Sequence, residues 1–552
     1  MAGIRQQTIT ATRERRESDG ASAPESHVSP RPRFRDPYLL TLLLILVLAI
    51  GVRCFLLTAH ATEEDFFITL RYARNLAAGH GFVYNPGARV LGTTTPLYTL
   101  VLALWMRLHV DPILGGKLLG IGADALACWA TYRLGRAIGR PGAGLAAAVC
   151  VALLPVNLIW ATKGMEVGEV AAAVAMTWAA WAERREIAAW AAAAVLVLLR
   201  IDGMALVAFL LLGTLLYERR LPWRGLLLFG ALLLPWLVFA TLYFGSPVPL
   251  SVAAKLQVYS HYATTPFPHL REFVGRMAHN VGAVLLVGCA VALVALIAAL
   301  ARRRTVNAGH LPPEIKLVVP ALWMMTYYAG MALSPVFLFG WYFVPPTPVY
   351  YLVAMTGWSL LLEWMLRGRG REFLQNAAAR NAAVIGACLL LIAFATPRVR
   401  EDLRSTQETE LTLRIPIGLW LRDHARSTDT VMLEPIGYIG YYSGLRVLDV
   451  VGLVSPEVLP YWNKQVACPR HELWQRFRPE WILLRAGEWA QLQQCEAALP
   501  PSERLTAQYA LAREWPGGSK PLFALFRRND VPVGQRLISM PLQAAVNTAW
   551  KE

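Results

Sequence analysis

The chain has 552 residues, of which 56% are hydrophobic and only 16% are charged, and its mean hydropathy is +0.41. This composition excludes an ordinary soluble domain, in which about a quarter of the residues are charged. The net charge of +16 does not indicate nucleic-acid binding, because most of the excess lies in short loops between apolar blocks, while residues 398–552 carry 19 basic against 17 acidic residues.

Both ends of the chain are expected to be tails. Residues 1–36 are polar and rich in Ser, Pro, Arg and Glu, which predicts a disordered cytoplasmic segment. The apolar run that follows, 38–57, begins too far from the start and is too long for a cleavable signal peptide, so we expect a membrane anchor. Residues 531–552 form the second predicted tail.

Apolar blocks with few internal charges fill the next part of the chain and predict eleven membrane-spanning helices within a transmembrane domain at 37–397. The expected spans lie near residues 38–57, 113–134, 143–161, 165–182, 187–201, 203–217, 223–244, 281–300, 315–335, 341–366 and 381–397.

One further apolar segment, 95–109, decides the topology. If it crossed the membrane there would be twelve spans, and the Arg clusters between later spans would all lie outside. If it lies along the membrane surface, those clusters fall inside together with Arg31, Arg33 and Arg35, as positively charged loops do. The segment is also short for a full crossing, so we expect an interfacial helix.

This topology creates an outer face that receives every unusual polar segment of the membrane domain. The segments are 58–112, 161–166, 200–203, 245–280, 335–341 and everything after about residue 398.

After residue 398 the apolar runs shorten to strand length and alternate with amphipathic helices, which predicts an extracytoplasmic α/β domain at 398–530. The expected strands are 430–433, 446–451, 481–484 and 522–527, and the expected helices are 408–425, 471–477 and 487–499. Cys468 and Cys495 are the only cysteines of this domain. An oxidising compartment favours a disulfide between them, and two unpaired thiols are the alternative.

Four segments of the predicted outer face carry charged groups at a membrane boundary. They contain Glu64, Asp65 and Arg71; Lys163 and Glu166; Arg200 and Asp202; and Lys255. Simpler explanations stay open, because acids suit a helix start, Lys163 can snorkel, and Arg200 can pair with Asp202. Four separate turns with charges at one depth favour a common cavity, since ionisable groups in such positions are usually functional.

These residue types suit transfer of a group from a lipid phosphate. Arg and Lys stabilise a phosphate leaving group. A carboxylate within hydrogen-bond reach of a sugar hydroxyl acts as a base. Direct displacement then inverts the anomeric carbon.

Residues 64–104, EDFFITLRYARNLAAGHGFVYNPGARVLGTTTPLYTLVLAL, resemble the first outer loop of GT-C-fold membrane glycosyltransferases that use polyprenyl-phosphate sugars. The nearest pattern is that of the group including the cell-wall arabinofuranosyltransferases. Further matches are GMEV at 164–167, RIDG at 200–203, the YFG…P…AK pattern ending at Lys255, WYFVPP at 341–346 and GYIGYYSGLRVLDVVGLVSPE at 437–457. Departures at Glu64, Phe66 and the run 93–95 mean that the sugar is not carried over.

The resemblance implies a multi-pass α-helical GT-C-like protein with a catalytic first outer loop at 58–112 and an inverting hexosyl- or pentosyltransferase activity. It implies Asp65 as the base, with Glu64 and Glu166 orienting the acceptor or sharing the role. The implied donor-phosphate ligands are Arg200, Lys255 and Arg71. The implied substrate-binding residues are Asp202, Trp341, Tyr342, His80 and Asn85, of which the last two suit loop shaping and the two aromatics equally suit an interfacial belt.

The expected partners are the lipid bilayer, a polyprenyl-phosphate-linked sugar, and a glycan, lipid or protein acceptor in the cell envelope of a bacterium. No cofactor is certain; a divalent cation is allowed, although metal-ligand spacings such as CxxC and HExxH do not occur. Two other functions stay open: a lipid or solute transporter or flippase, and a non-catalytic assembly or sensor protein. Transporters usually show paired halves, and this sequence has no internal repeat.

Overall fold

Helices form most of the chain in the computed structural model, which describes residues 38–57, 62–262, 267–278, 281–305, 313–365, 377–463, 465–517 and 520–531. The predicted tail at 1–36 and all but the first residue of 531–552 lie outside these residues. Long apolar stretches become helices because a helix satisfies every backbone hydrogen bond within the segment, as lipid requires.

Each of the eleven predicted spans contains a helix. The bounds are α2 Leu39–Leu57, α5 Pro112–Ala137, α6 Pro141–Leu153 with α7 Pro155–Trp160, α8 Val167–Ala182, α9 Glu186–Leu199, α10 Met204–Glu218, α11 Trp223–Phe244, α14 Val281–Thr305, α15 Val318–Leu333, α16 Thr347–Met365 and α18 Ala377–Thr406. The helix break at Leu154 precedes Pro155, because proline disfavours helical geometry in the residue before it.

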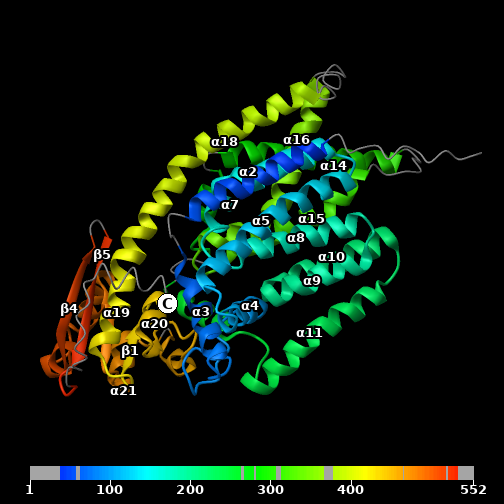
Figure 1. Cartoon of the computed structure of the whole chain (residues 1–552). Helices are drawn as coiled ribbons and strands as arrows, with labels where there is room; N and C mark the ends of the chain where they lie inside the picture. The colour runs from blue at the N-terminus through cyan, green and yellow to red at the C-terminus, as the bar shows by residue number, and fades with distance from the viewer. Residues whose placement is uncertain are drawn as a thin grey trace, which may run out of the picture. The chain divides into compact units, whose positions relative to one another are not determined.

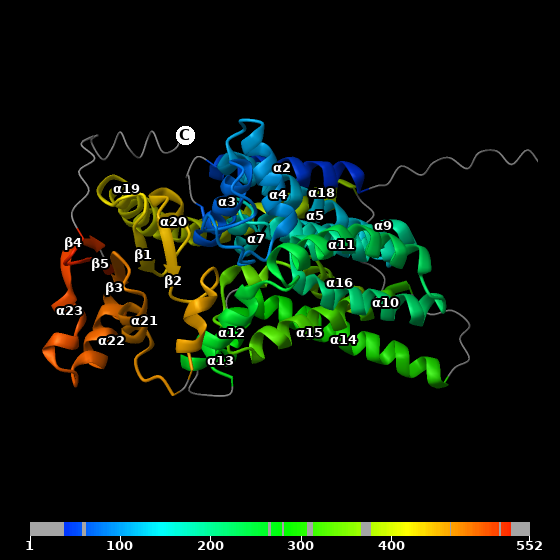
Figure 2. The same cartoon turned by 90° about the horizontal axis from the view of Figure 1, so that it is seen from below.

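By length and composition, five helices of the described residues can cross a membrane, or up to six if one bent pair counts as a span. The chain is therefore a multi-pass membrane protein, and the number of eleven spans stays a prediction. Within the bundle, α5 packs against α8 and α6, and α16 packs against α14 and α6. Figures 1 and 2 show the bundle from two directions.

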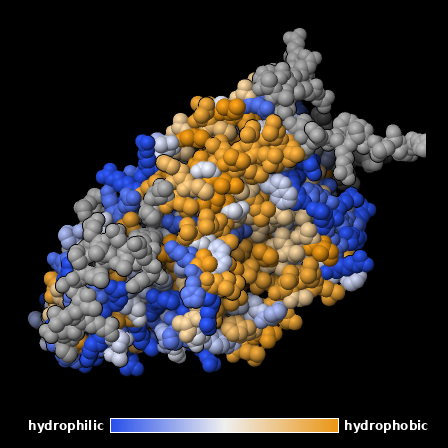
Figure 3. Space-filling model, viewed as in Figure 1, coloured by the Kyte–Doolittle hydropathy of each residue, from blue (hydrophilic) through white to orange (hydrophobic). Residues whose placement is uncertain are grey.

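Apolar side chains cover the outside of several of these helices. Leu43 and Val47 of α2 and Leu389 and Leu390 of α18 are exposed. Figure 3 shows hydrophobic residues over this region, with hydrophilic residues toward the lower left, where the strands lie in Figure 1, and at the right. Exposed apolar helix surface flanked by polar ends is the pattern expected for contact with lipid.

Shorter helices connect the long ones: α3 Glu64–Ala77, α4 Pro96–Arg107, η1 Ile201–Gly203, α12 Leu250–Tyr262, α13 Leu270–Ala278, η2 Pro313–Leu317 and η3 Gly340–Phe343. Helix α4 corresponds to the predicted interfacial segment 95–109. Its 12 residues extend about 18 Å at about 1.5 Å per residue, less than the roughly 30 Å hydrocarbon core.

A five-stranded mixed sheet follows α18, in the strand order β2-β1-β3-β5-β4. The strands are β1 Thr430–Leu433, β2 Arg446–Asp449, β3 Trp481–Arg485, β4 Tyr509–Gly517 and β5 Lys520–Arg528. The helical segments between them are η4 Gln407–Arg414, α19 Ile415–His424, α20 Tyr438–Ser443, η5 Pro456–Tyr461, α21 Pro469–Phe477, α22 Ala486–Glu496, η6 Pro501–Glu503 and α23 Leu505–Gln508. The α/β domain predicted from the sequence is present, and the elements that we did not predict are β4, α20, α23 and the short helices η5 and η6.

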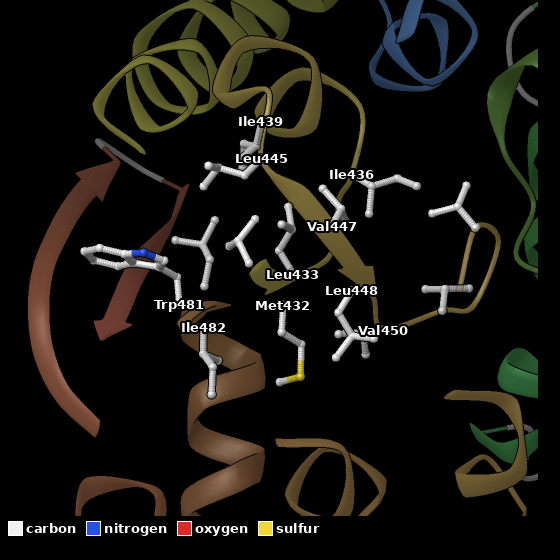
Figure 4. Close-up of a cluster of buried hydrophobic side chains, with 14 of the residues drawn as sticks. Met432, Leu433, Ile436, Ile439, Leu445, Val447, Leu448, Val450, Trp481 and Ile482 are labelled. Carbon is white, nitrogen blue, oxygen red and sulfur yellow. The ribbon is translucent and has the colours of Figure 1, made fainter. Parts of the chain in front are cut away.

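The first three strands pair in parallel, β1 with β2 from Thr430 opposite Arg446 and β1 with β3 from Val431 opposite Trp481. Strands β3, β5 and β4 pair in antiparallel fashion. Figure 4 shows the buried cluster at this sheet, where Met432 and Leu433 of β1 lie among side chains of β2, β3 and α20. Parallel strands buried on both faces need such continuous apolar runs.

The hydrophobic core of the sheet extends into the predicted first outer loop, which is called the first outer loop from here on. Tyr72 and Tyr84 from that loop belong to the same buried cluster as Val431, Val447 and Ile482 of the sheet. Helix α18 also continues through the predicted domain boundary at residue 397, as Figure 1 shows, and residues 40–552 pack as one unit. The first outer loop and the sheet therefore hold each other in place.

Candidate functional site

A cavity of about 260 Å³ lies where the predicted outer segments meet. Its charged and aromatic lining residues are Asp65 of α3, Glu166 before α8, Arg200 and Asp202 around η1, Lys255 of α12, and Trp341 and Tyr342 of η3. The turn 92–95 and Leu453 from the segment after β2 complete the wall. Five of the charged residues that the sequence analysis singled out thus line one cavity.

Helix α3 presents Asp65, Ile68 and Thr69 to the cavity. Residues three and four positions apart share one face of a helix, which explains this set. The other face buries Phe66 and Phe67, both at most 1% exposed, so the helix cannot rotate without losing apolar burial. Asp65 lies in the first turn, where an acid is stabilised by the helix dipole.

Lys255 is the cation that faces Asp65. Its Nζ lies 3.6 Å from Asp65 Oδ2 and 5.0 Å from the centre of the Phe339 ring. Burial opposes the charge of Lys255, but the carboxylate of Asp65 outweighs it, so the pKa of the ammonium is raised above its ordinary value. Lys255 is therefore a charged group in the cavity at neutral pH.

Arg200 is the second cation, and two carboxylates hold it. Its NH2 lies 3.1 Å from Asp202 Oδ2, and its NH1 lies 3.3 Å from Glu166 Oε1. Burial disfavours the charged guanidinium, but Asp202 and Glu166 outweigh burial and raise the pKa of Arg200 well above its ordinary value. Burial raises the pKa of Glu166 and the charge of Arg200 lowers it, with a net increase.

Aromatic rings form the wall beside the two cations. The Trp341 ring stacks on Phe339 with 4.3 Å between ring centres and meets Trp160 edge-on at 5.5 Å. The Arg200 guanidinium lies 5.6 Å from the centre of the Tyr342 ring. A wall of this kind suits the face of a sugar ring or a prenyl chain.

Small hydroxyl side chains also line the cavity; the run 93–95 was expected to mark a different acceptor or sugar, and Thr69 and Ser251 were not predicted. Thr93 Oγ1 and Thr95 Oγ1 lie 3.0 Å apart, and Thr69 Oγ1 lies 3.4 Å from Thr95 Oγ1. Ser251, one helical turn before Lys255, is 4% exposed, and its hydroxyl has no hydrogen-bond partner among the described residues. The four-residue spacing from Lys255 on one helix is the signal that would have identified Ser251.

Glu64 and Arg71 do not line the cavity. Glu64 accepts hydrogen bonds from the backbone N–H of Gly437 at 2.5 Å and of Tyr438 at 3.2 Å, and from Arg414 at 3.1 Å. A Cβ on Gly437 would lie 2.0 Å from the Glu64 carbonyl oxygen, so the close approach requires glycine there. Glu64 thus joins the first outer loop to the sheet domain, which corrects our placement of it beside the base.

Arg71 is 2% exposed and donates to three backbone carbonyls, those of Tyr84 at 2.9 Å, Gly440 at 2.5 Å and Leu445 at 2.6 Å. Because its N–H groups are bonded to these carbonyls, the guanidinium of Arg71 faces the sheet domain. It is not placed to bind the phosphate of a sugar donor. This corrects the placement of Arg71 that the sequence implied.

Three more polar residues of the outer segments lie outside the cavity. Asn85 pairs with both backbone groups of Val447, donating at 2.8 Å and accepting at 3.0 Å, so it extends the edge of β2. His80 is exposed in the turn after α3. Lys163 lies between Glu63 at 3.2 Å and Asp402 at 3.0 Å.

The cavity offers a poor site for a divalent cation. Its three carboxylates already face cations, Asp65 facing Lys255, and Glu166 and Asp202 facing Arg200. Within the described part of the chain, no group of three or more His, Cys, Asp or Glu side chains is arranged to hold a metal ion. The donor set does not fit a resident metal, and no step below involves one.

Cys468 and Cys495 form a disulfide, with 5.9 Å between their Cα atoms. The bond joins the start of α21 to the end of α22. It lies in the α/β domain and not at the cavity, so it stabilises the domain.

Comparisons with known proteins agree with the fold. A family model described as Domain of unknown function (DUF8728) matches residues 401–533. A search of the curated proteins found no match. The crystal structure of ArnT from Cupriavidus metallidurans bound to undecaprenyl phosphate is similar over 88% of this chain and 98% of its own, with 14% identity and a TM-score of 0.53.

A second similar structure is the archaeal oligosaccharyltransferase AglB from Archaeoglobus fulgidus in complex with an inhibitory peptide and a dolichol-phosphate. The similarity extends over 89% of this chain and 75% of the AglB chain, with 13% sequence identity and a TM-score of 0.53. The same oligosaccharyltransferase has been crystallised in complex with Zn and sulfate. At these identities the likeness shows the fold alone, which is the GT-C class predicted from the sequence.

Proposed function

We propose that this protein is an inverting glycosyltransferase that moves a sugar from a polyprenyl-phosphate donor to a glycan, lipid or protein acceptor. The observation that carries the proposal is that Asp65, Lys255 and Arg200, from three separate segments, line one cavity, with Asp65 Oδ2 3.6 Å from Lys255 Nζ. A carboxylate beside two cations is the set that proton removal and phosphate departure require. The undecaprenyl phosphate bound in the ArnT structure and the dolichol-phosphate in the AglB complex support this donor class.

In the proposed reaction, Lys255 and Arg200 bind the donor phosphate. The acceptor oxygen attacks the anomeric carbon and its proton passes to Asp65. The bond between the anomeric carbon and the phosphate oxygen breaks, and the electron pair stays on the polyprenyl phosphate that leaves. Attack from the side opposite the leaving group inverts the anomeric carbon.

Glu166 and Asp202 have a positioning role in this scheme. Their carboxylate oxygens lie 3.3 Å (Glu166) and 3.1 Å (Asp202) from the guanidinium of Arg200, and these contacts hold it in place and keep it charged. An Arg held in this way loses little conformational freedom when a phosphate binds. Trp341 and Tyr342 are proposed to contact the sugar or the first prenyl units, and Thr93–Thr95 to contact sugar hydroxyls.

The proposed orientation places the cavity and the α/β domain on the outer face of a bacterial cell membrane, following the Arg-rich inner loops. Reporter fusions after Arg140 and after Arg398 test it, with the first expected inside and the second outside. The opposite result at either position rejects the orientation.

The test of the activity uses the full chain in lipid nanodiscs. Mass spectrometry of the lipid that co-purifies identifies the carrier and its sugar, and the purified protein is then given that lipid-linked sugar. Release of sugar-free polyprenyl phosphate, dependent on Asp65, supports a transferase. Movement of the intact lipid across the bilayer without cleavage shows a flippase instead.

A further inference from the structure

A second cavity, of about 680 Å³, lies beside the first and has no role in the proposed reaction. It is lined by α7, α13, α14, α16 and α18. The short helix η3 separates the two cavities: its Trp341 and Tyr342 line the first, and its Gly340 and Phe343 line the second. The volume is in the range of about 300–1,000 Å³ that is usual for small-molecule sites.

The second cavity is apolar with cationic groups. Its charged lining residues are Glu272, Arg276 and Arg398. Arg276 NH2 is 2.5 Å from Glu272 Oε1, so these two charges neutralise each other. Arg398 packs against the Phe394 ring at 4.7 Å, and no described carboxylate is paired with it. The lining therefore has a formal charge of +1, carried by Arg398.

A buried hydroxyl in the same wall also has no partner. Tyr350 is 6% exposed, and its hydroxyl makes no hydrogen bond within the described residues. A buried polar group that stays unpaired destabilises the folded protein, and a hydrogen bond to an oxygen-bearing ligand would remove that cost. An unpaired cation, an unpaired hydroxyl and apolar walls together describe a site for an amphiphile with an anionic head.

We infer that this cavity binds a second, membrane-resident anionic phospholipid, with its phosphate at Arg398 and part of an acyl chain along the aromatic wall. This inference rests on the proposed function in one respect: a polyprenyl-phosphate sugar has a single phosphate, and Arg200 and Lys255 are assigned to it. The cation in the separate apolar cavity, Arg398, is therefore expected to bind a different anion. Arg398 directly follows the predicted span 381–397, where a lipid headgroup lies.

The experiment measures lipid retention by native mass spectrometry of the full chain, purified from nanodiscs of phosphatidylglycerol and phosphatidylcholine in equal amounts. Wild-type protein is expected to retain one phosphatidylglycerol in preference to phosphatidylcholine. Arg398→Gln removes the cation and should lower that retention about tenfold, the effect of losing a charge-assisted hydrogen bond. Arg400→Gln, at an exposed position two residues later on the same helix, is the matched control and should retain the lipid.

A second variant tests the volume independently of the charge. Gly275 lines the cavity, and a Cβ there would have no atom within 4 Å, so a side chain can begin at this position and Gly275→Phe adds a ring to the cavity wall. It should also abolish retention. If neither Arg398→Gln nor Gly275→Phe changes the preference for phosphatidylglycerol, the inference is wrong.

The affinity for undecaprenyl phosphate, measured on the same variants, separates this site from the donor site. Arg398→Gln and Gly275→Phe should bind undecaprenyl phosphate like wild type. If both variants lower the affinity for undecaprenyl phosphate as much as Arg200→Ala does, the second cavity is part of the donor site and the inference fails. If wild-type protein retains phosphatidylglycerol but binds no undecaprenyl phosphate, the proposed function fails while the lipid site stands.

Discussion

Lys255 Nζ lies 3.6 Å from Asp65 Oδ2, so the proposed phosphate ligand and the proposed base contact each other. In the proposed reaction, a donor phosphate would compete with Asp65 for this ammonium. A phosphate on Lys255 would weaken the contact between Lys255 and Asp65, and the proposal therefore links donor binding to release of the Asp65 carboxylate.

Asp65→Asn keeps the size and polarity of the side chain but cannot accept a proton. We expect its single-turnover rate of sugar transfer to fall by about 100-fold or more, because general-base catalysis contributes about that much. Donor affinity should be retained, since an interaction made only in the transition state affects turnover. Asp423→Asn, at a half-buried position near the end of α19 and outside the cavity, is the matched control. If Asp65→Asn transfers sugar at the wild-type rate, Asp65 is not the base.

Arg71→Ala separates structural from substrate-binding roles. The change leaves the buried carbonyl of Leu445 without a donor and removes one of two donors from the carbonyls of Tyr84 and Gly440, so the free energy of unfolding should fall by about 3 kcal/mol or more. Arg74→Ala, which loses one such bond to Tyr441, should have a smaller effect. Thermal unfolding measures both, and the folded Arg71→Ala protein should bind undecaprenyl phosphate like wild type. A large loss of affinity at a temperature where the variant is folded contradicts the structural role.

The sequence predicted the part of the site that depends on topology. Asp65, Glu166, Arg200, Asp202 and Lys255 come from turns on the same predicted face, and helices of similar length bring such turns to one depth. The apolar blocks identified the long helices for the same reason: lipid leaves no alternative backbone structure.

Contacts between distant segments could not be predicted in this way. Glu64 and Arg71 meet residues more than 350 positions away in the sheet domain, and a single sequence carries no signal of that pairing. Charge at a membrane boundary suggested a ligand role for Arg71, whereas buried backbone carbonyls determine its position. Strand β4 was missed because Ala510, Ala512 and Glu514 are poor strand formers, and it is held at the sheet edge by pairing with β5.

The stability of the sheet domain should depend on pH through Asp449. Burial raises the pKa of Asp449 to about 7 from an ordinary value of 3.8, against the lowering effect of hydrogen bonds from the N–H groups of Val451 and Val454. A raised pKa means that the folded state binds more protons in this interval. The free energy of unfolding therefore decreases as the pH rises from 3.8 to about 7 and is level above it.

Asp449→Asn removes this titration. The variant has a lower melting temperature at every pH because one backbone N–H loses its acceptor, but the drop in melting temperature between about pH 5 and about pH 8 should be smaller than in wild type. Glu457→Gln, at an exposed position in η5, should keep the full drop. An unchanged drop in Asp449→Asn would exclude Asp449 as its origin.

The affinity of the full chain for undecaprenyl phosphate tests the central claim most directly, because it needs neither the sugar nor the acceptor. Arg200→Ala and Lys255→Ala should each weaken binding by roughly 2–5 kcal/mol, which is about 30-fold or more. Asp65→Asn should bind at least as tightly as wild type, because it removes the carboxylate that competes with the phosphate for Lys255. If both cation variants bind like wild type, or if Asp65→Asn weakens binding as much as they do, this cavity is not the donor-phosphate site.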